Sequence, residues 1–345
     1  MPQDDPPVWK VASVVSFYMA VALVMVMVNK WVLTKTSLPL TFLFLQLSIA
    51  VLLILLSSLS SPTLFHIPRL CRKTLLALAP LCLVNLIGLI FNIYCLQLVD
   101  ASYFQVARGL TLPITVLLTS FTSGEKPMNQ ILISCFFVTY GFTYSFIPLP
   151  WISNDKTVEE TPILGMLLGT ACAMMIAIHA ILVKNALKVV DGKMLDLAYW
   201  QNLLSAVGLI PFILFSGEIG GVERLIKGEE GDLWAFIIGS GVTGIVGFLI
   251  CIAGLLSIKV TSPVTHMFSA AVRSVLQTIL GVYLFHDVLN TNRIMSIILI
   301  ILGGLLYTWH KARTQVKPTP PDVAKEPLLS DQTIDLEKGL SEERS

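Results

Sequence analysis

Ten long apolar runs, separated by short polar segments, dominate this 345-residue sequence. A helix needs about 20 mostly apolar residues to cross the hydrocarbon core of a bilayer, and runs of roughly 17–25 residues meet that requirement. Only 13% of the residues are charged, which is too few to cover the surface of a water-soluble domain. We therefore expect an all-α, polytopic membrane protein. Its ten expected transmembrane helices cover residues 11–29, 38–59, 74–98, 103–122, 128–148, 162–184, 197–216, 233–256, 262–285 and 292–310.

The polar segments between these runs are expected to be loops, the longer ones at 60–73, 150–162, 188–196 and 216–232. Ten spans place both termini on one side of the membrane. Lysine and arginine accumulate on the cytosolic side of membrane proteins, and they favour the side of the termini by twelve to six, so we predict cytosolic termini. The twelve are Lys10, Arg69, Arg72, Lys73, Lys126, Lys184, Lys188, Lys193, Lys259, Lys311, Arg313 and Lys317. The six are Lys30, Lys35, Lys156, Arg224, Lys227 and Arg293.

This order of segments divides the chain into four parts. Residues 1–10 are expected to form a cytosolic N-terminus, followed by a first apolar run that acts as an uncleaved anchor. Residues 11–148 and 162–312 are expected to form two five-helix units. Residues 313–345 are polar, contain several prolines and have mixed charge, which predicts a disordered cytosolic tail.

One spacing recurs in the two halves of the chain. Glu125 precedes Gly141 by sixteen residues, and Asp287 precedes Gly303 by sixteen residues. The last two spans of one half thus correspond to the last two of the other, which makes the chain five helices plus five. Because five is odd, the second half enters the membrane with opposite polarity. The pattern predicts a 5+5 inverted repeat, which is frequent among secondary transporters; the alternative is a duplicated scaffold without transport.

Each half also carries one arginine inside an apolar span, Arg108 in 103–122 and Arg273 in 262–285. Arg273 lies eleven residues into its helix, about 16 Å at 1.5 Å per residue, and so near mid-bilayer. An arginine at the centre of a spanning helix costs roughly 2.5–3.5 kcal/mol on an insertion scale, which makes a functional role the default interpretation. A guanidinium binds phosphate through two parallel hydrogen bonds. We expect both arginines to face one aqueous cavity and to bind a phosphate-bearing ligand.

The alternative for these arginines is a buried structural ion pair. That pair needs an acid at membrane depth, whereas the candidate acids, Asp100, Glu125, Asp196 and Asp287, all fall at helix ends. Lys30 ends the first span and either adds a third positive charge at the mouth of the cavity or anchors the helix at the interface.

Further polar side chains enter the apolar spans and are candidates for the same site. Asn92 shares a helix face with Asn85, and His179 lies in the sixth span. The seventh span opens with aromatic and amide residues, which can stack a base and read its edge; these are Tyr199, Trp200, Gln201 and Asn202. Spacings of four and seven residues place three more near Arg273, namely His266, Ser269 and Gln277. Interhelical hydrogen bonds and an interfacial aromatic belt are the alternative interpretations.

Other patterns exclude some classes of function. The five histidines show neither metal-ligand spacing nor catalytic pairing, so we expect no metal, no cofactor and no enzymatic activity. A membrane enzyme acting on lipid-linked or nucleotide-activated sugars would need acids or a metal cluster at membrane depth. The stretch GSGVTG at 239–244 lies inside an apolar span, where close helix packing explains its glycines better than dinucleotide binding does.

Several stretches resemble the drug/metabolite transporter superfamily, in its triose-phosphate and nucleotide-sugar transporter branch. These stretches are VNKWVL (28–33), FNIYCLQLVDASYFQVARGLT (91–111), KVVDGKMLDLAYWQN (188–202), VTSPVTHMFSAAVRSVLQTIL (260–280) and GGLLYTW (303–309). Within that branch the chain is most similar to the Golgi GDP-fucose transporters. In such carriers a Phe-Tyr-Asn-Asn element in the seventh span implies guanine recognition, and Asn202 matches its last asparagine. A small-residue motif ending in lysine implies sugar-diphosphate contact, and Arg273 stands at that lysine.

The resemblance implies a multi-pass protein of the Golgi or ER membrane that is an antiporter. It would exchange a cytosolic nucleotide sugar, with GDP-fucose as the leading candidate, for a lumenal nucleoside monophosphate. The alternatives are an exchanger of another GDP- or UDP-sugar, an exchanger of a phosphorylated C3–C6 metabolite, or a non-transporting adaptor. No nucleic-acid partner is expected, and GMLLG at 165–169 packs helices either within one chain or between the chains of a homodimer.

Overall fold

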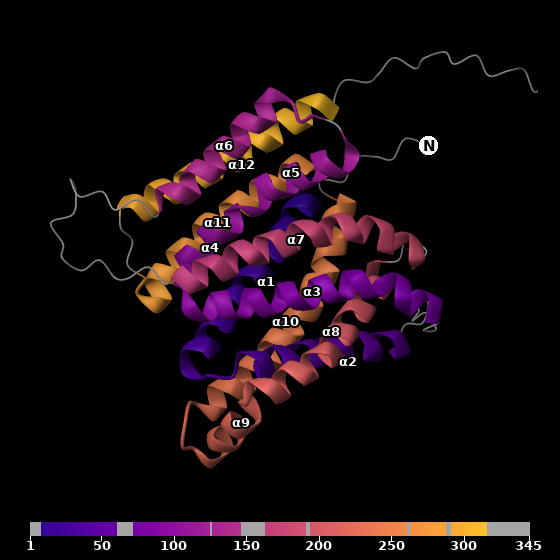
Figure 1. Ribbon diagram of the computed structural model, residues 1–345, viewed down its shortest axis with the longest axis vertical. Helices are drawn as coiled ribbons and strands as arrows, with labels where there is room; N and C mark the ends of the chain where they lie inside the picture. The colour runs from indigo at the N-terminus through magenta and orange to yellow at the C-terminus, as the bar shows by residue number, and fades with distance from the viewer. Residues whose placement is uncertain are drawn as a thin grey trace, which may run out of the picture.

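The computed structural model describes residues 8–60, 72–124, 126–145, 163–190, 194–260, 263–287 and 291–315. Every regular element in these ranges is an α-helix, which confirms the all-α prediction (Figure 1). The elements are α1 (Val8–Lys35), α2 (Pro39–Ser60), α3 (Arg72–Leu98), α4 (Ala101–Gly109), α5 (Thr111–Ser123), α6 (Asn129–Tyr144), α7 (Ile163–Val189), α8 (Met194–Ser216), α9 (Glu218–Lys227), α10 (Leu233–Val260), α11 (Pro263–Phe285) and α12 (Thr291–Gln315). Most of the predicted tail, residues 316–345, lies outside the described part, as do residues 1–7 and Glu125.

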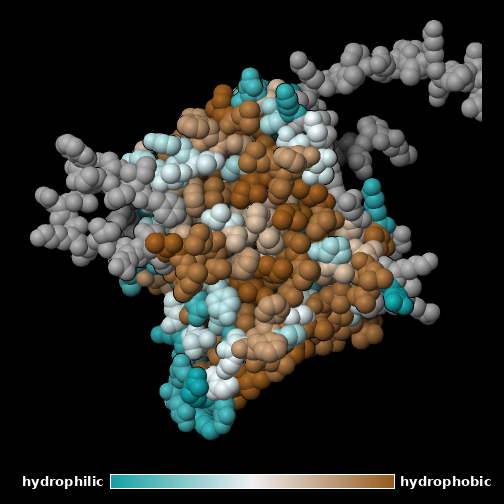
Figure 2. Space-filling model, viewed as in Figure 1, coloured by the Kyte–Doolittle hydropathy of each residue, from teal (hydrophilic) through white to brown (hydrophobic). Residues whose placement is uncertain are grey.

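Eight helical segments of the described chain are long and apolar enough to cross a membrane. The predicted span 128–148 corresponds to α6, which has 16 residues, and the predicted span 262–285 corresponds to α11, in which Val272–Phe285 forms the apolar stretch. For these two the crossing stays a prediction. Figure 2 shows a surface that is mostly hydrophobic over the long helices and hydrophilic around α9. Phe121 and Phe215 are among the apolar side chains exposed on this bundle, at 94% and 91%.

The predicted span 103–122 is interrupted near its start and consists of α4 and α5. Pro113 has no backbone N–H to donate to the carbonyl of Gly109, so one bond of a continuous helix is missing. The N–H of Leu110 donates to Ala107 O at 3.3 Å, as in a tighter 3₁₀ turn. The interruption therefore lies directly after Arg108.

The predicted loop at 216–232 contains α9 and is corrected by the structure. Glycines with left-handed backbone bound the helix, Gly217 at φ +76° and Gly228 at φ +72°. Leu225 is buried and belongs to the same hydrophobic cluster as Leu38, so the apolar face of this amphipathic helix packs on the rest of the chain. This helix was not predicted because it has only ten residues, too few for a membrane span, and its many polar residues are typical of a loop.

Glu218, the first residue of α9, caps the start of α2. Its buried carboxylate accepts hydrogen bonds from the N–H of Leu40 at 3.0 Å and from the N–H and hydroxyl of Thr41 at 2.7 Å each. These are backbone donors that the first turn of a helix cannot satisfy internally. Nearby, hydrogen bonds from Arg224 and Ser37 hold the pKa of the exposed Glu230 carboxyl below its usual range.

Two of the three glycines of 239–244 serve close helix packing, as expected, whereas a Cβ on Gly241 would meet no atom within 4 Å. A Cβ on Gly239 would lie 2.0 Å from Val32 Cγ2 on α1, and a Cβ on Gly244 would lie 2.5 Å from Ile49 Cβ on α2. Only glycine allows α10 to approach both helices this closely. The stretch GMLLG also packs within the chain, since a Cβ on Gly169 would lie 2.5 Å from Ala107 Cβ.

The long helices pair across the two halves of the sequence. α6 packs along α12, as Figure 1 shows, α3 packs along α7, and α1 packs along α10. α2 contacts both α8 and α10, while α11 contacts α1, α4 and α12. This arrangement places α4 and α11, which carry Arg108 and Arg273, against each other inside the bundle.

Candidate functional site

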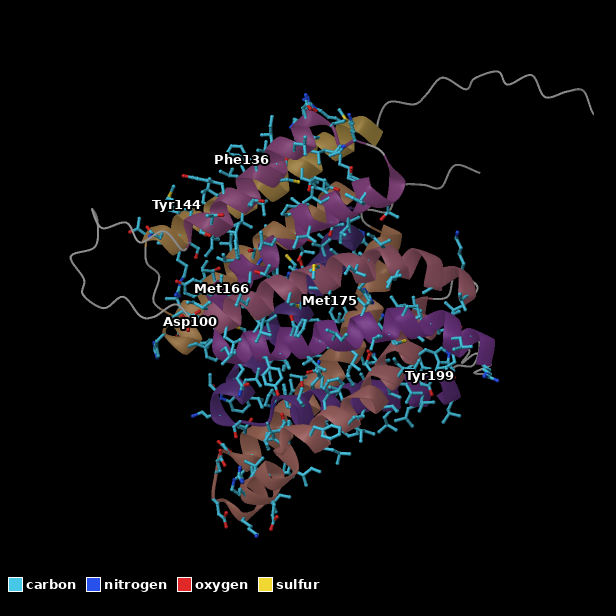
Figure 3. The ribbon with its side chains drawn as sticks, in the orientation of Figure 1. Asp100, Phe136, Tyr144, Met166, Met175 and Tyr199 are labelled. Atoms are coloured by element: carbon cyan, nitrogen blue, oxygen red, sulfur yellow. The ribbon has the colours of Figure 1, made fainter. Side chains whose placement is uncertain are left out.

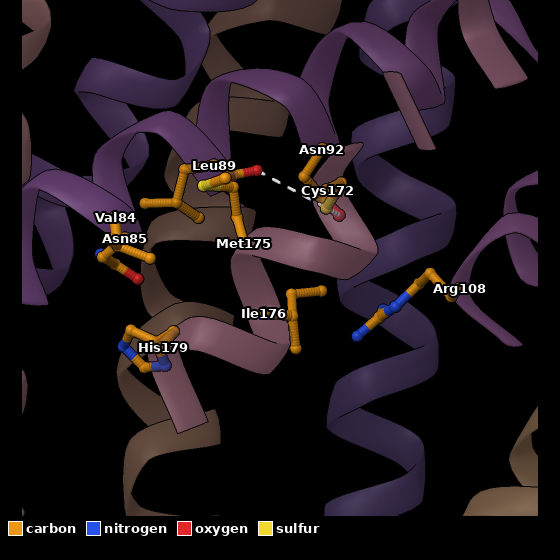
Figure 4. Close-up of a pocket in the computed structure, with 10 residues that line it drawn as sticks. Val84, Asn85, Leu89, Asn92, Arg108, Cys172, Met175, Ile176 and His179 are labelled. Carbon is orange, nitrogen blue, oxygen red and sulfur yellow. Dashed lines mark hydrogen bonds between the residues drawn. The ribbon is translucent and has the colours of Figure 1, made fainter. Parts of the chain in front are cut away.

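A cavity of about 230 Å³ lies between α3, α4 and α7 (Figure 4). Three of the residues predicted for the site meet there: Asn92 from α3, Arg108 from α4 and His179 from α7. Asn85, which shares a face of α3 with Asn92 as predicted, also lines it. The other lining residues are Val84, Gly88, Leu89, Cys172, Met175 and Ile176.

Arg108 extends into this cavity from the side opposite Asn85 and His179 in the view of Figure 4. Its guanidinium carbon lies 5.5 Å from the centroid of the Phe104 ring. Among the described residues, no carboxylate lies within salt-bridge distance of Arg108. The described protein therefore leaves this charge without a counter-ion.

Arg273 on α11 lies close enough to Arg108 for the two like charges to act on each other. Its guanidinium carbon is 5.9 Å from the centroid of the Tyr18 ring on α1. In the described ranges no carboxylate pairs with Arg273 either. The structure thus brings the two predicted arginines near each other, but only Arg108 is among the residues that line the cavity.

Residues of α8 support the uncharged side of the cavity. The amide nitrogen of Gln201 forms a hydrogen bond with Nε2 of His179, and Asn85 Nδ2 donates to Ser205 Oγ at 3.0 Å. Gln201 therefore reaches the predicted site through His179, since it is not itself a lining residue.

Tyr199 and Trp200 do not line the cavity. Both are buried in a hydrophobic cluster with residues of α2 and α3, and their rings meet edge to face at 5.0 Å between centroids. Figure 3 labels Tyr199 near one end of the long helices and Asp100 near the other. Asn202 is half-buried on α8 and is also absent from the lining. The structure does not place the expected base-stacking pair at the site.

The other residues of α11 that were predicted for the site lie outside the cavity or outside the described residues. Ser269 and Gln277 are buried, at 4% and 2% exposure, and neither lines the cavity. The Gln277 amide donates to Ala101 O at 3.4 Å and so ties α11 to the start of α4. The side chain of His266 lies outside the described residues.

Lys30 caps the end of α3. Its ammonium donates to Leu96 O at 3.0 Å and to Val99 O at 2.6 Å, and the side chain is buried. A cation at the C-terminus of a helix binds the last free carbonyls and opposes the helix dipole. Lys30 is therefore not among the residues that line the cavity, and its ammonium points into the protein instead of anchoring the helix at the interface.

An ion pair at the same end of the bundle was not predicted from the sequence. Arg293, 4% exposed, donates to Asp100 Oδ2 at 3.1 Å, and its guanidinium lies 3.7 Å from the centroid of the Tyr103 ring. Asp100 and Asp287 also act electrostatically on Lys30. These charged groups link the ends of α1, α3 and α11 to the starts of α4 and α12. The sequence indicated them only by the positions of acidic residues at helix ends.

Comparison with known proteins adds independent observations. The sequence profile of the Triose-phosphate Transporter family matches residues 9–308. GDP-fucose transporter 1 of Dictyostelium discoideum is 30% identical over 310 residues, with 87% of this chain and 80% of the relative covered. GDP-fucose transporter 1 of Monosiga brevicollis is 28% identical, with 93% and 95% covered, and a UDP-sugar transporter of Drosophila melanogaster is 22% identical, with 89% and 79% covered. One solved crystal structure shares the fold at a TM-score of 0.55 and 14% identity, over 88% of this chain and 99% of that one.

Proposed function

Since the chain belongs to the triose-phosphate transporter family, we propose that it is a secondary-active antiporter of nucleotide sugars. It moves a nucleotide sugar, with GDP-fucose as the leading candidate, from the cytosol into the Golgi lumen. A nucleoside monophosphate leaves the lumen in exchange. The identity of the substrate is supported by relatives named as GDP-fucose transporters that align with most of the chain.

The observation that carries this proposal is the pair of neighbouring arginines, of which Arg108 lines the cavity. Arg108 and Arg273 bring two positive charges together within apolar helices, and no described carboxylate neutralises either. Uncompensated charge inside a membrane protein marks a substrate or ion pathway. Both proposed substrates carry phosphate, which a guanidinium binds strongly.

The packing of the helices supports the predicted 5+5 inverted repeat. We match α1, α2, α3, α4/α5 and α6 in order with α7, α8, α10, α11 and α12. If each helix is replaced by its counterpart, a contact within the structure should correspond to another observed contact. The α3–α7 contact corresponds to α10–α1, the α2–α10 contact to α8–α3, and the α11–α12 contact to α5–α6, and all of these occur. The α6–α12, α2–α8 and α4–α11 contacts map onto themselves.

The two glycines with matching spacing support the same repeat. A Cβ on Gly141 of α6 would lie 2.9 Å from Leu299 Cβ on α12, while a Cβ on Gly303 of α12 would lie 2.6 Å from Val138 Cγ2 on α6. Each glycine thus packs against the helix that carries the other. An inverted repeat places the substrate site where the halves meet and lets one half rock against the other around it.

Counter-flow uptake into proteoliposomes tests the substrate assignment. The purified protein is reconstituted, and labelled GDP-fucose is offered outside while single unlabelled compounds are loaded inside: GDP-fucose, GMP, other GDP-sugars, UDP-sugars and C3–C6 sugar phosphates. We expect GMP and GDP-fucose to drive the fastest uptake. A UDP-sugar relative at 22% identity makes UDP-linked sugars the second candidate, and faster exchange with UDP-sugars and UMP would replace the GDP assignment. Uptake driven only by sugar phosphates would contradict nucleotide-sugar transport.

A further inference from the structure

The cavity has one charged side and one uncharged polar side, and we infer that the uncharged side, formed by Asn85 and His179, binds the nucleobase. Arg108 then holds the phosphates on the opposite side. This inference rests on the proposed function and deepens it, because it assigns base recognition to α3 and α7 instead of the aromatic start of α8.

The length of the cavity follows from the two helices that form its walls. Asn92 and Asn85 are seven residues apart on α3, and Cys172 and His179 are seven apart on α7, which is about 10 Å along each helix. Cys172 Sγ lies 3.7 Å from Asn92 Oδ1, so these two residues mark one end. Because α3 and α7 run in opposite directions, Asn85 and His179 share the other end. The separation is comparable to that between the base and the phosphates of an extended nucleotide.

The hydrogen bonds behind Asn85 and His179 fix what each side chain offers to a ligand. In this orientation of the Gln201 amide its nitrogen faces Nε2 of His179 and donates to it, which assigns the imidazole proton to Nδ1. His179 then has an N–H left to donate. Asn85 uses its amide nitrogen on Ser205, which leaves its carbonyl oxygen as an acceptor.

A fixed donor beside a fixed acceptor suits a nucleobase better than a sugar. Guanine and uracil each carry a ring N–H next to a carbonyl in one rigid plane, whereas hydroxyl groups rotate to suit either partner. Leu89 and Ile176 line the cavity as well and offer apolar contact to a flat ring. Gln201 acts through His179 and is a positioning residue.

Paired binding measurements test the assignment. Affinities of GDP and of inorganic pyrophosphate, which lacks a base, are measured by calorimetry on the purified full-length protein in detergent. We expect the wild type to bind GDP at least tenfold more tightly. His179→Ala and Asn85→Ala should each lower the ratio of GDP affinity to pyrophosphate affinity about tenfold. Pyrophosphate affinity should stay unchanged, and this unchanged value also shows that the variants fold. Gln201→Met keeps the approximate size of the side chain and removes its donor without adding charge, so it should lower this ratio of GDP to pyrophosphate affinity in the same direction.

Matched controls lie on the same helices and face outward. Leu83→Ala on α3 and Met174→Ala on α7, at 58% and 44% exposure, should leave both affinities unchanged. The inference is overturned if the wild-type ratio of GDP to pyrophosphate affinity persists in the His179 and Asn85 variants, or if Tyr199→Leu or Trp200→Leu abolishes it while pyrophosphate affinity is unchanged. The proposed function fails separately if the wild type binds GDP no better than pyrophosphate.

Discussion

Arg108 on α4, which lines the cavity, and Arg273 on α11 act on each other as like charges. The described protein supplies no carboxylate to relieve that repulsion. A bound phosphate group would do so, because it attracts both guanidiniums at once. We therefore expect the two guanidiniums to repel each other in the empty site and a bound phosphate to relieve that repulsion.

Neutralising Arg108 should weaken ligand binding and stabilise the empty protein. Arg108→Met removes a charge-assisted hydrogen bond of about 1.5–3 kcal/mol, so GDP affinity should fall about 10- to 100-fold. The same change removes the repulsion from Arg273, so the free energy of unfolding without ligand should rise. Calorimetry and unfolding in mixed micelles measure the two effects. Arg108→Lys, which keeps the charge, is the control, and a Met variant that is destabilised when empty would argue against charge strain.

Removing the carboxylate of Glu218 should destabilise the fold without touching the cavity. Glu218→Ala leaves the N–H groups of Leu40 and Thr41 unpaired in a buried position, which costs about 1–3 kcal/mol. The control is Glu223→Ala, which removes an exposed i,i+4 pair with Lys227 and should cost less than about 0.5 kcal/mol. Equal loss in the two variants would show that Glu218 does not cap α2.

The reciprocal packing of Gly141 and Gly303 predicts equal sensitivity at the two positions. Alanine at either position meets the facing helix, at Leu299 or Val138, and should cost about 1–3 kcal/mol through overpacking. Gly304→Ala is the control, since a Cβ there meets no atom within 4 Å. It should be neutral or stabilising by up to about 1 kcal/mol through helix propensity. Tolerance at only one of the two packed glycines would count against the inverted repeat.

The Asp100–Arg293 pair should respond asymmetrically to deletion of its two partners. Asp100→Ala removes an ion-pair partner from a guanidinium that is 4% exposed, while Arg293→Ala leaves a carboxylate that is 39% exposed and can be hydrated. We expect the free energy of unfolding to fall by about 2–3 kcal/mol in Asp100→Ala and by about 1 kcal/mol in Arg293→Ala. Both losses are smaller than the roughly 3–5 kcal/mol for breaking a fully buried pair, because water reaches the carboxylate. A double-mutant cycle in mixed micelles measures both, and a larger loss for Arg293→Ala would contradict the burial of the guanidinium.

The helices could be predicted because long apolar runs in a chain with so little charge are typical of membrane-spanning segments. The arginines could be predicted because charge in such a run is costly and needs a reason. The amphipathic helix α9 was not predicted, since its apolar face becomes evident only in the folded protein, where Leu225 and Leu38 belong to one hydrophobic cluster.

Contacts between distant segments could not be predicted from the sequence. The hydrogen bonds of Lys30 join residues 66 and 69 positions apart, and no local pattern distinguishes a lysine that caps another helix from one at the membrane interface. Tyr199 and Trp200 were assigned to base stacking by residue type and resemblance. Their burial in the hydrophobic cluster that α8 forms with α2 and α3 depends on how these helices pack together.

Strained cations in the empty site have a direct consequence for transport. A carrier whose two guanidiniums lack a phosphate should reorient slowly, because closing the helices around the empty site leaves both charges buried and uncompensated. Exchange should then be obligatory. Uptake of labelled GDP-fucose is measured in proteoliposomes preloaded with GMP and in empty ones. We predict fast uptake only with internal GMP; equal initial rates in the two preparations would contradict the account.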